Sequence, residues 1–180
     1  MRSCALKDLA SYVIAIPDYP KPGILFRDIT GILDSADGLR LAIDQLADRL
    51  EGMQFDAIVS MESRGFIFGM PLAYKLNKAF VPVRKPGKLP RATVSASYAL
   101  EYGTDTLEMH RDALKPGARV VVVDDLLATG GTAEACARLV DAVGAKVVKM
   151  LFVIELEGFN ASASRLSSYD VDALIKYPGK

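Results

Sequence analysis

Residues 120–132, VVVVDDLLATGGT, decide the fold class of this chain. The four consecutive valines predict a strand that is buried on both faces, as in a parallel sheet. Two aspartates stand where this strand should end, and a short loop with two glycines leads into a helical pattern. A buried strand that runs through a short loop into a helix is typical of an α/β domain.

The loop after this strand has the features of a phosphate site. Gly130 and Gly131 allow the backbone to adopt positive φ and to approach a ligand closely. The first N–H groups of the following helix have no partner within the helix and lie at the positive end of its dipole. Thr129 and Thr132 add hydroxyl donors, so we expect the loop from Ala128 onward to bind an anion. The alternative is that a threonine only caps the helix.

Asp124 and Asp125 precede the loop and would repel a phosphate group placed directly on them. An ionised carboxylate accepts hydrogen bonds, so we expect the pair to face donors, and ribose hydroxyls are good candidates. Adjacent side chains on a strand point to opposite faces, so the two aspartates need not share one role. The alternative is that both are solvated. Together with the loop, the pair fits a ligand that carries a sugar diol and a phosphate.

Composition limits the architecture and the partners. The chain has 180 residues, 51% of them hydrophobic, which predicts one domain over residues 1–180. Its formal net charge of zero argues against a large nucleic-acid surface, and no apolar run reaches the length of a membrane span. Cys4 and Cys136 lie far apart in the sequence, so we expect no disulfide framework and a cytoplasmic location.

Strand and helix patterns alternate along the chain. This alternation predicts an α/β fold with a mostly parallel central sheet and helices on both faces. Two segments look like insertions on that core: a small N-terminal hood over about residues 16–34 and a flexible β-hairpin over about residues 84–110. Ligands of open parallel sheets bind beyond the carboxyl ends of the strands. We therefore expect residues 62–65, Arg84 and residues 124–132 to surround one crevice.

Several common motifs are absent. No G-x-G-x-x-G motif follows a strand, and no G-x-x-x-x-G-K-[ST] or G-x-S-x-G motif occurs. The single histidine, His110, excludes a histidine-rich metal site. The remaining possibilities are ligands held by backbone loops, basic side chains and carboxylates.

Basic side chains occur at two further places. Arg64 lies in a second strand-to-helix turn, where its guanidinium can donate two N–H groups to a phosphate. Arg84 and Lys88 belong to a basic loop rich in proline and glycine. Each charge could instead be solvated. Two anion sites and a basic loop together favour a polyphosphate ligand.

Two other residues have open interpretations. Glu101 is expected at the tip of the predicted hairpin, where a carboxylate is solvated unless the loop folds over the crevice. Phe26 follows a Pro-Gly turn and could either join the core or stack on a base.

Residues 120–132 resemble the phosphoribosyl-diphosphate binding motif of the type I phosphoribosyltransferases. Residues 22–28, 62–66, 84–90 and 100–103 stand in the order and spacing of the adenine phosphoribosyltransferase branch of that family. The resemblance extends over about residues 16–156. It implies a cytoplasmic purine-salvage homodimer that makes AMP and diphosphate from adenine and 5-phosphoribosyl 1-diphosphate with Mg²⁺.

The resemblance also implies how the phosphoribosyl diphosphate is held. The backbone of Ala128, Thr129, Gly130, Gly131 and Thr132 would hold the 5′-phosphate. Asp124 and Asp125 would take the ribose hydroxyls, directly or through metal-bound water. Arg64, Arg84 and Lys88 would bind the diphosphate. No side chain is implied as a certain metal ligand, because substrate and water would hold most of the Mg²⁺ coordination.

For the base, the resemblance implies a second group of residues. Leu25 and Arg27 would recognise adenine through backbone groups, and Phe26 and Leu156 would sandwich its ring. Glu101 would contact N7 and assist proton transfer, so Glu101 and Arg64 are the candidate catalytic residues.

Two alternatives remain open. The first is a phosphoribosyltransferase for another base, because recognition by backbone atoms leaves little trace in side chains. The second is a non-catalytic regulator of the same fold that senses phosphoribosyl diphosphate. A regulator that binds nucleic acid would need a basic face or a further domain, neither of which is evident in this neutral chain.

Overall fold

Five parallel strands form the central sheet of the computed structural model, which describes residues 8–100 and 103–179. Their order is β4-β3-β7-β8-β9, and every neighbouring pair in this sheet is parallel. The strands are β3 (Ala57–Met61), β4 (Ala79–Val83), β7 (Arg119–Leu127), β8 (Lys146–Leu156) and β9 (Val171–Tyr177). The predicted α/β fold with a mostly parallel sheet is confirmed.

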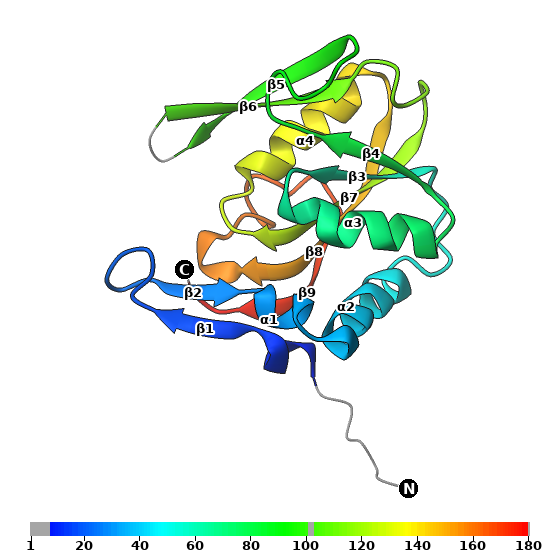
Figure 1. Cartoon of the computed structure of the whole chain (residues 1–180). Helices are drawn as coiled ribbons and strands as arrows, with labels where there is room; N and C mark the ends of the chain where they lie inside the picture. The colour runs from blue at the N-terminus through cyan, green and yellow to red at the C-terminus, as the bar shows by residue number, and fades with distance from the viewer. Residues whose placement is uncertain (1–7, 101–102, 180) are drawn as a thin grey trace, which may run out of the picture.

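Helices cover both faces of this sheet (Figure 1). One face carries α4 (Gly131–Ala142), and the other carries α2 (Ala36–Asp48) and α3 (Arg64–Lys75). The valines of β7 alternate between the two cores. Val120 and Val122 pack with the α4 side, and Val121 and Val123 pack with the α2 and α3 side. The valine run is therefore buried on both faces because each face has its own helical layer.

The N-terminal part of the described chain forms a small antiparallel unit. A 3-10 helix, η1 (Leu9–Tyr12), leads into β1 (Ile14–Pro17), which pairs with β2 (Leu25–Asp28). The short helix α1 (Thr30–Leu33) then connects this unit to α2. Ser35 caps α2, because its hydroxyl oxygen accepts a hydrogen bond from the N–H of Gly38 at 3.2 Å.

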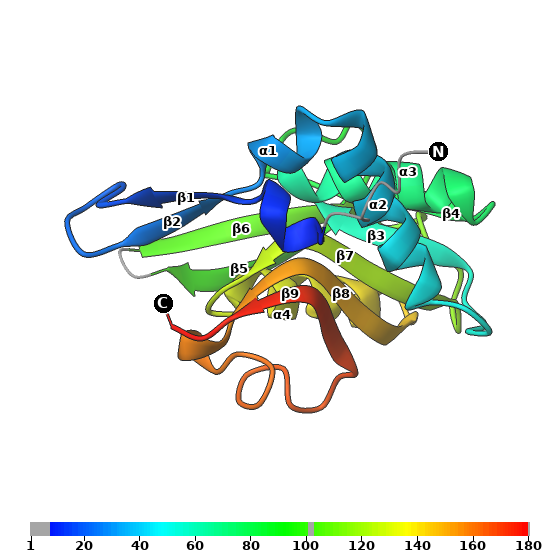
Figure 2. The ribbon, with the colours of Figure 1, turned by 90° about the horizontal axis from the view of Figure 1, so that it is seen from below.

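A second antiparallel pair consists of β5 (Thr93–Leu100) and β6 (Gly103–His110). Leu107 and Met109 of β6 join the core under α4. Both hairpins, β1–β2 and β5–β6, project on the side of the sheet toward which β8 points (Figures 1 and 2). A last short helix, η2 (Glu157–Phe159), follows β8 directly. None of the helices within the described residues has the length and apolar character that a membrane crossing requires.

Candidate active site

The loop between β7 and α4 is shaped by Gly130. Gly130 has φ of 77° and occupies the N-cap position of α4, and no side chain caps this helix end. A Cβ atom at Gly130 would lie 3.2 Å from the Cβ of Ala161, so space as well as conformation favours glycine. The uncapped N–H groups of the first turn are therefore free to bind an anion.

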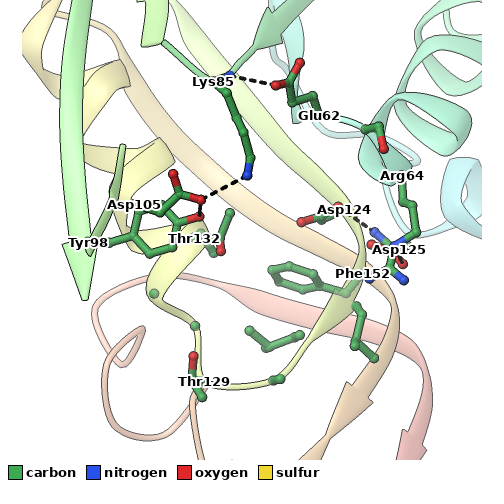
Figure 3. A pocket seen from close by; sticks show the side chains of 17 residues that line it. Glu62, Arg64, Lys85, Tyr98, Asp105, Asp124, Asp125, Thr129, Thr132 and Phe152 are labelled. Atoms are coloured by element: carbon green, nitrogen blue, oxygen red, sulfur yellow. Dashed lines mark hydrogen bonds and ion pairs between the residues drawn. The ribbon is translucent and has the colours of Figure 1, made fainter. Parts of the chain in front are cut away.

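This loop lines a polar cavity of about 410 Å³ (Figure 3). The lining includes all five residues from Ala128 to Thr132 and also Phe152 and Tyr98. Its charged side chains are Glu62, Arg64, Lys85, Asp105, Asp124 and Asp125. We call this space the polar cavity. It lies beyond the carboxyl ends of β3 and β7, as expected for an open parallel sheet.

Asp124 and Asp125 both line the polar cavity, but their surroundings differ. Asp125 is only 4% exposed, and the Nε of Arg64 lies 2.9 Å from its carboxylate. An oxygen of Asp124 accepts a hydrogen bond from the N–H of Asp125 at 2.9 Å. Burial raises the pKa of Asp124 well above its usual value, and the charge of Asp125 raises it further. Burial also raises the pKa of Asp125, although the Arg64 guanidinium opposes that shift.

Gly65 lets the start of α3 approach the end of β7. A Cβ atom at Gly65 would lie 2.8 Å from an oxygen of Asp124 and 3.2 Å from the carbonyl oxygen of Val123. No side chain fits at that distance without a shift of the neighbouring atoms. The glycine of the second strand-to-helix turn therefore brings Arg64 and the aspartate pair to one place.

Glu62 organises the basic segment after β4. Its carboxylate accepts a hydrogen bond from the Nε of Arg84 at 2.6 Å and from the backbone N–H of Lys85 at 2.9 Å. Burial opposes ionisation of Glu62, but these two donors outweigh it and lower the pKa of the carboxyl. The Lys85 side chain then reaches Asp105 of β6, with 3.3 Å between Nζ and the carboxylate (Figure 3).

A second, apolar cavity of about 470 Å³ adjoins the polar one. Leu25, Phe26 and Arg27 of β2 line it, together with Leu156 and Phe159. Four residues line both spaces: Arg64, Asp125, Leu126 and Ala128. We call this second space the apolar cavity. A ligand with an anionic end and a flat apolar end could therefore extend across both cavities.

Comparisons with known proteins show the family to which this chain belongs. The family model of the phosphoribosyl transferase domain matches residues 29–175. An adenine phosphoribosyltransferase of Agathobacter rectalis is 58% identical over 97% of this chain and 100% of its own length. The chain belongs to the adenine phosphoribosyltransferases.

Solved structures of adenine phosphoribosyltransferases have the same fold. The enzyme from Thermoanaerobacter pseudethanolicus superposes with a TM-score of 0.91 at 51% identity, covering 96% of this chain and 99% of its own. The enzyme from Saccharomyces cerevisiae has a TM-score of 0.87 at 36% identity, covering 94% of this chain and 97% of its own. That structure is described as complexed with D-2,5-dideoxy-2,5-imino-altritol 1,6-bisphosphate and adenine.

The structure of this member of the adenine phosphoribosyltransferases brings most of the candidate residues together. Arg64, Asp124, Asp125 and residues 128–132 line the polar cavity. Leu25, Phe26, Arg27 and Leu156 line the apolar cavity. Arg84 and Lys88 are not in the lining of either, and Glu101 lies outside the described residues.

Sequence reasoning missed several residues that line the polar cavity. Lys85 is one of them: the sequence does not distinguish it from the basic side chains beside it, because the contacts of Glu62 with Arg84 and with the Lys85 backbone set their directions. Tyr98 and Asp105 come from facing positions of β5 and β6, and the Tyr98 hydroxyl donates to Asp105 at 3.3 Å. No local pattern in the sequence places that hairpin beside α4, so no signal identified these two residues.

Proposed function

We propose that this chain transfers the phosphoribosyl group of 5-phosphoribosyl 1-diphosphate to adenine, releasing AMP and diphosphate. The observation that carries the proposal is the pair of adjoining cavities, which share Arg64, Asp125, Leu126 and Ala128. One has a glycine loop and charged side chains, as a sugar phosphate requires, and the other is lined largely by apolar side chains, as a purine requires. The relatives at high identity carry the same activity in their names.

In this proposal the polar cavity holds the phosphoribosyl diphosphate. The N–H groups of residues 128–132 bind the 5′-phosphate, and Asp124 and Asp125 accept hydrogen bonds from the ribose hydroxyls. Arg64 lies between the two cavities, where the anomeric carbon would be, and its side chain would stabilise the departing diphosphate. Lys85 points into the same cavity and joins it (Figure 3), while Arg84 and Lys88 would reach the diphosphate only after the loop moves.

The reaction breaks the bond between the anomeric carbon and a diphosphate oxygen and forms a bond from that carbon to N9 of adenine. Positive charge develops on the sugar as the diphosphate leaves, as it does in glycoside cleavage. Fixed cationic side chains stabilise the negative charge of the leaving group. No covalent nucleophile is needed. Adenine loses one ring proton as the bond to N9 forms, and Glu101 is proposed to accept that proton at N7.

The apolar cavity would hold adenine. Phe26 and Leu156 would flank the ring, and backbone groups of Leu25 and Arg27 would read its edge. Tyr19 packs edge-on against Phe26 with 5.2 Å between ring centroids, which supports the position of the stacking ring. Because the edge would be read by backbone groups, discrimination among bases depends on how firmly β2 is held.

Mg²⁺ is proposed as the cofactor, held mainly by the substrate. Among the described residues no group of three or more histidine, cysteine, aspartate and glutamate side chains could hold a metal ion alone. The two carboxylates near the end of β7 fit a metal that substrate oxygens and water also coordinate. When bound, the ion would neutralise charge on the diphosphate. Asp124 and Asp125 would then orient the metal-bound water.

A homodimer in the cytoplasm completes the proposal. Ile67, Met70 and Tyr74 lie on one face of α3 at helical spacing, and all three are exposed. A stripe of large apolar side chains on a surface helix fits contact with a second copy of the chain. The cytoplasmic location agrees with the state of Cys136, which is a free thiol in the described part of the chain. Burial raises the pKa of this thiol and so keeps it unreactive.

The direct test mixes the protein with adenine, 5-phosphoribosyl 1-diphosphate and Mg²⁺ and measures AMP and diphosphate. Parallel reactions contain hypoxanthine, guanine, xanthine or orotate in place of adenine. We expect rapid AMP formation and little product with the other bases. Faster turnover of another base would show that this other base, and not adenine, is the preferred substrate. Salt-dependent nucleic-acid binding without any consumption of base would indicate the regulator.

A further inference from the structure

Tyr177, the last residue of β9, touches both sides of the apolar cavity. In the sheet it pairs with Leu156 of β8, which lines that cavity. Its ring also lies under the guanidinium of Arg27 in β2, with 3.9 Å between the Arg27 Cζ and the ring centroid. Leu156 and Arg27 belong to elements that are more than one hundred residues apart in the sequence. Tyr177 is therefore a direct link between the two sides of the cavity.

The Arg27 side chain is occupied by this contact. A guanidinium at such a distance from a tyrosine ring makes a cation–π interaction. Because the guanidinium packs on Tyr177, this contact restrains Arg27 relative to β9. Phe26 is the adjacent residue of β2, so the same contact also limits its movement.

The segment after Tyr177 contacts η2, which lies beside the apolar cavity. The N–H of Gly158 in η2 donates to the carbonyl oxygen of Gly179 at 3.0 Å. A Cβ atom at Gly158 would lie 2.5 Å from the carbonyl carbon of Gly179, so the two backbones are in close contact. Phe159, the next residue of η2, lines the apolar cavity. Tyr177 contacts the β2 side, and Gly179, two residues after the end of β9, contacts the η2 side.

We propose that Tyr177 is a positioning residue for base recognition: it fixes Arg27 and Phe26 relative to Leu156 and thereby governs the affinity and selectivity for adenine. The inference rests on the proposed function, because it assigns the apolar cavity to the base. It predicts that loss of the ring affects the base and leaves the phosphoribosyl diphosphate site intact.

The experiment compares steady-state kinetics of Tyr177→Leu and Tyr177→Phe. We expect Tyr177→Leu to raise the KM for adenine about tenfold, the size of one cation–π contact, and to reduce selectivity over hypoxanthine. The KM for phosphoribosyl diphosphate should change less than about twofold, because the polar cavity is untouched. Tyr177→Phe keeps the ring and should behave like the wild type. Asp172→Asn on the same strand weakens the ion pair of Asp172 with Arg49, away from the cavity, and so controls for a general loosening of β9.

A second variant tests the partner of the contact. Arg27→Met removes the charge but keeps the backbone groups, and it should reproduce the rise in the KM for adenine. The double variant should be no worse than either single one, because both remove one interaction. Additive effects, equal rises in both KM values, or impairment by Tyr177→Phe would each overturn the proposal.

Hydrogen exchange separates this proposal from the proposed function. Amides of β2 should exchange faster in Tyr177→Leu than in the wild type or in Tyr177→Phe. Hydrogen exchange can be measured without any enzymatic activity. If Tyr177→Leu fails to fold, the same measurement on Arg27→Met tests the contact. Unchanged exchange in β2 would overturn the positioning role. A wild-type protein that made no AMP would instead overturn the proposed function.

Discussion

Asp124 and Asp125 are adjacent carboxyl groups near the end of β7, which continues to Leu127, and their environment opposes ionisation. Burial raises the pKa of both, and the charge of Asp125 adds to the shift at Asp124. Such a pair stores unfavourable electrostatic free energy that donors of a bound ligand can relieve. At the scale of single residues, we therefore expect ionisation of Asp124 to lower the stability of the unliganded protein.

Replacing Asp124 with asparagine should separate stability from activity. A raised carboxyl pKa means that the folded state binds protons more tightly, so the free energy of unfolding falls as pH rises from the ordinary aspartate value of about 3.9. We expect Asp124→Asn to melt at a higher temperature than the wild type at pH 7, with the difference vanishing near pH 4. AMP formation should fall about 10²-fold.

Thermal unfolding scans at several pH values measure the melting temperatures of Asp124→Asn and the wild type, and turnover assays measure their rates of AMP formation. A lower melting temperature at pH 7 would contradict the prediction.

The same pair predicts a pH dependence of substrate binding. Ribose hydroxyls and Mg²⁺ favour the ionised carboxylates, so binding should release a proton. The affinity for phosphoribosyl diphosphate should therefore increase as pH rises through the raised pKa of Asp124, and the increase should be smaller in Asp124→Asn. Calorimetry in two buffers of different ionisation enthalpy measures the proton release. Proton uptake on binding would be the opposite result.

Gly65→Ala should disturb the site through one atom. The added Cβ would lie 2.8 Å from an oxygen of Asp124 and 3.2 Å from a backbone oxygen, so the aspartate must move. We expect a loss of stability of about 1–3 kcal/mol, as in other overpacked sites, and a larger proportional loss of turnover. Gly117→Ala is the control, because φ of 80° strains that position but nothing lies within 4 Å and the site is distant. Equal turnover in the two variants would show that Gly65 has no special part in the site.

At the scale of elements, the segment between β4 and β5 decides which basic side chain enters the polar cavity. Glu62 binds Arg84 and the backbone of Lys85, and this leaves the Lys85 side chain directed at Asp105 (Figure 3). We expect Lys85→Met to raise the KM for phosphoribosyl diphosphate more than Lys88→Met does. Lys115→Met, in a turn away from the site, controls for the loss of one charge. A larger effect at Lys88 would show that loop closure brings that residue in instead.

Elements that are determined by neighbouring residues could be predicted from the sequence. Contacts that depend on the packing of distant segments could not. Four valines and a glycine loop determine the strand and the helix start without reference to the rest of the chain. The predicted strand end at the two aspartates is wrong, because pairing with β8 continues β7 to Leu127. Lys85 and Arg84 are indistinguishable by type, and only the carboxylate of Glu62, more than twenty residues earlier, separates them. Tyr98 and Asp105 line the cavity because their hairpin packs on α4, a long-range contact that residue patterns do not encode.

At the scale of the whole molecule, α3 connects the site to a proposed dimer contact. Met70 is 50% exposed and Tyr74 is 88% exposed, and together with Ile67 they form an apolar stripe along this helix. The helix begins at Arg64, one of the four residues that line both cavities. A second copy packed on this stripe would restrain the helix that carries Arg64.

Met70→Glu should therefore change both assembly and activity. A buried unpaired carboxylate at an apolar contact is costly, so light scattering after size exclusion should show a dimer for the wild type and a monomer for the variant. We expect the monomer to turn over more slowly, because α3 loses its support, while its melting temperature falls only modestly. Arg40→Glu on α2, an exposed position away from the stripe, should remain a dimer. A wild-type monomer at micromolar concentration, or a dimer that persists in Met70→Glu, would place the contact elsewhere. If Met70→Glu were monomeric but fully active, the two cavities of one chain would be sufficient for the reaction.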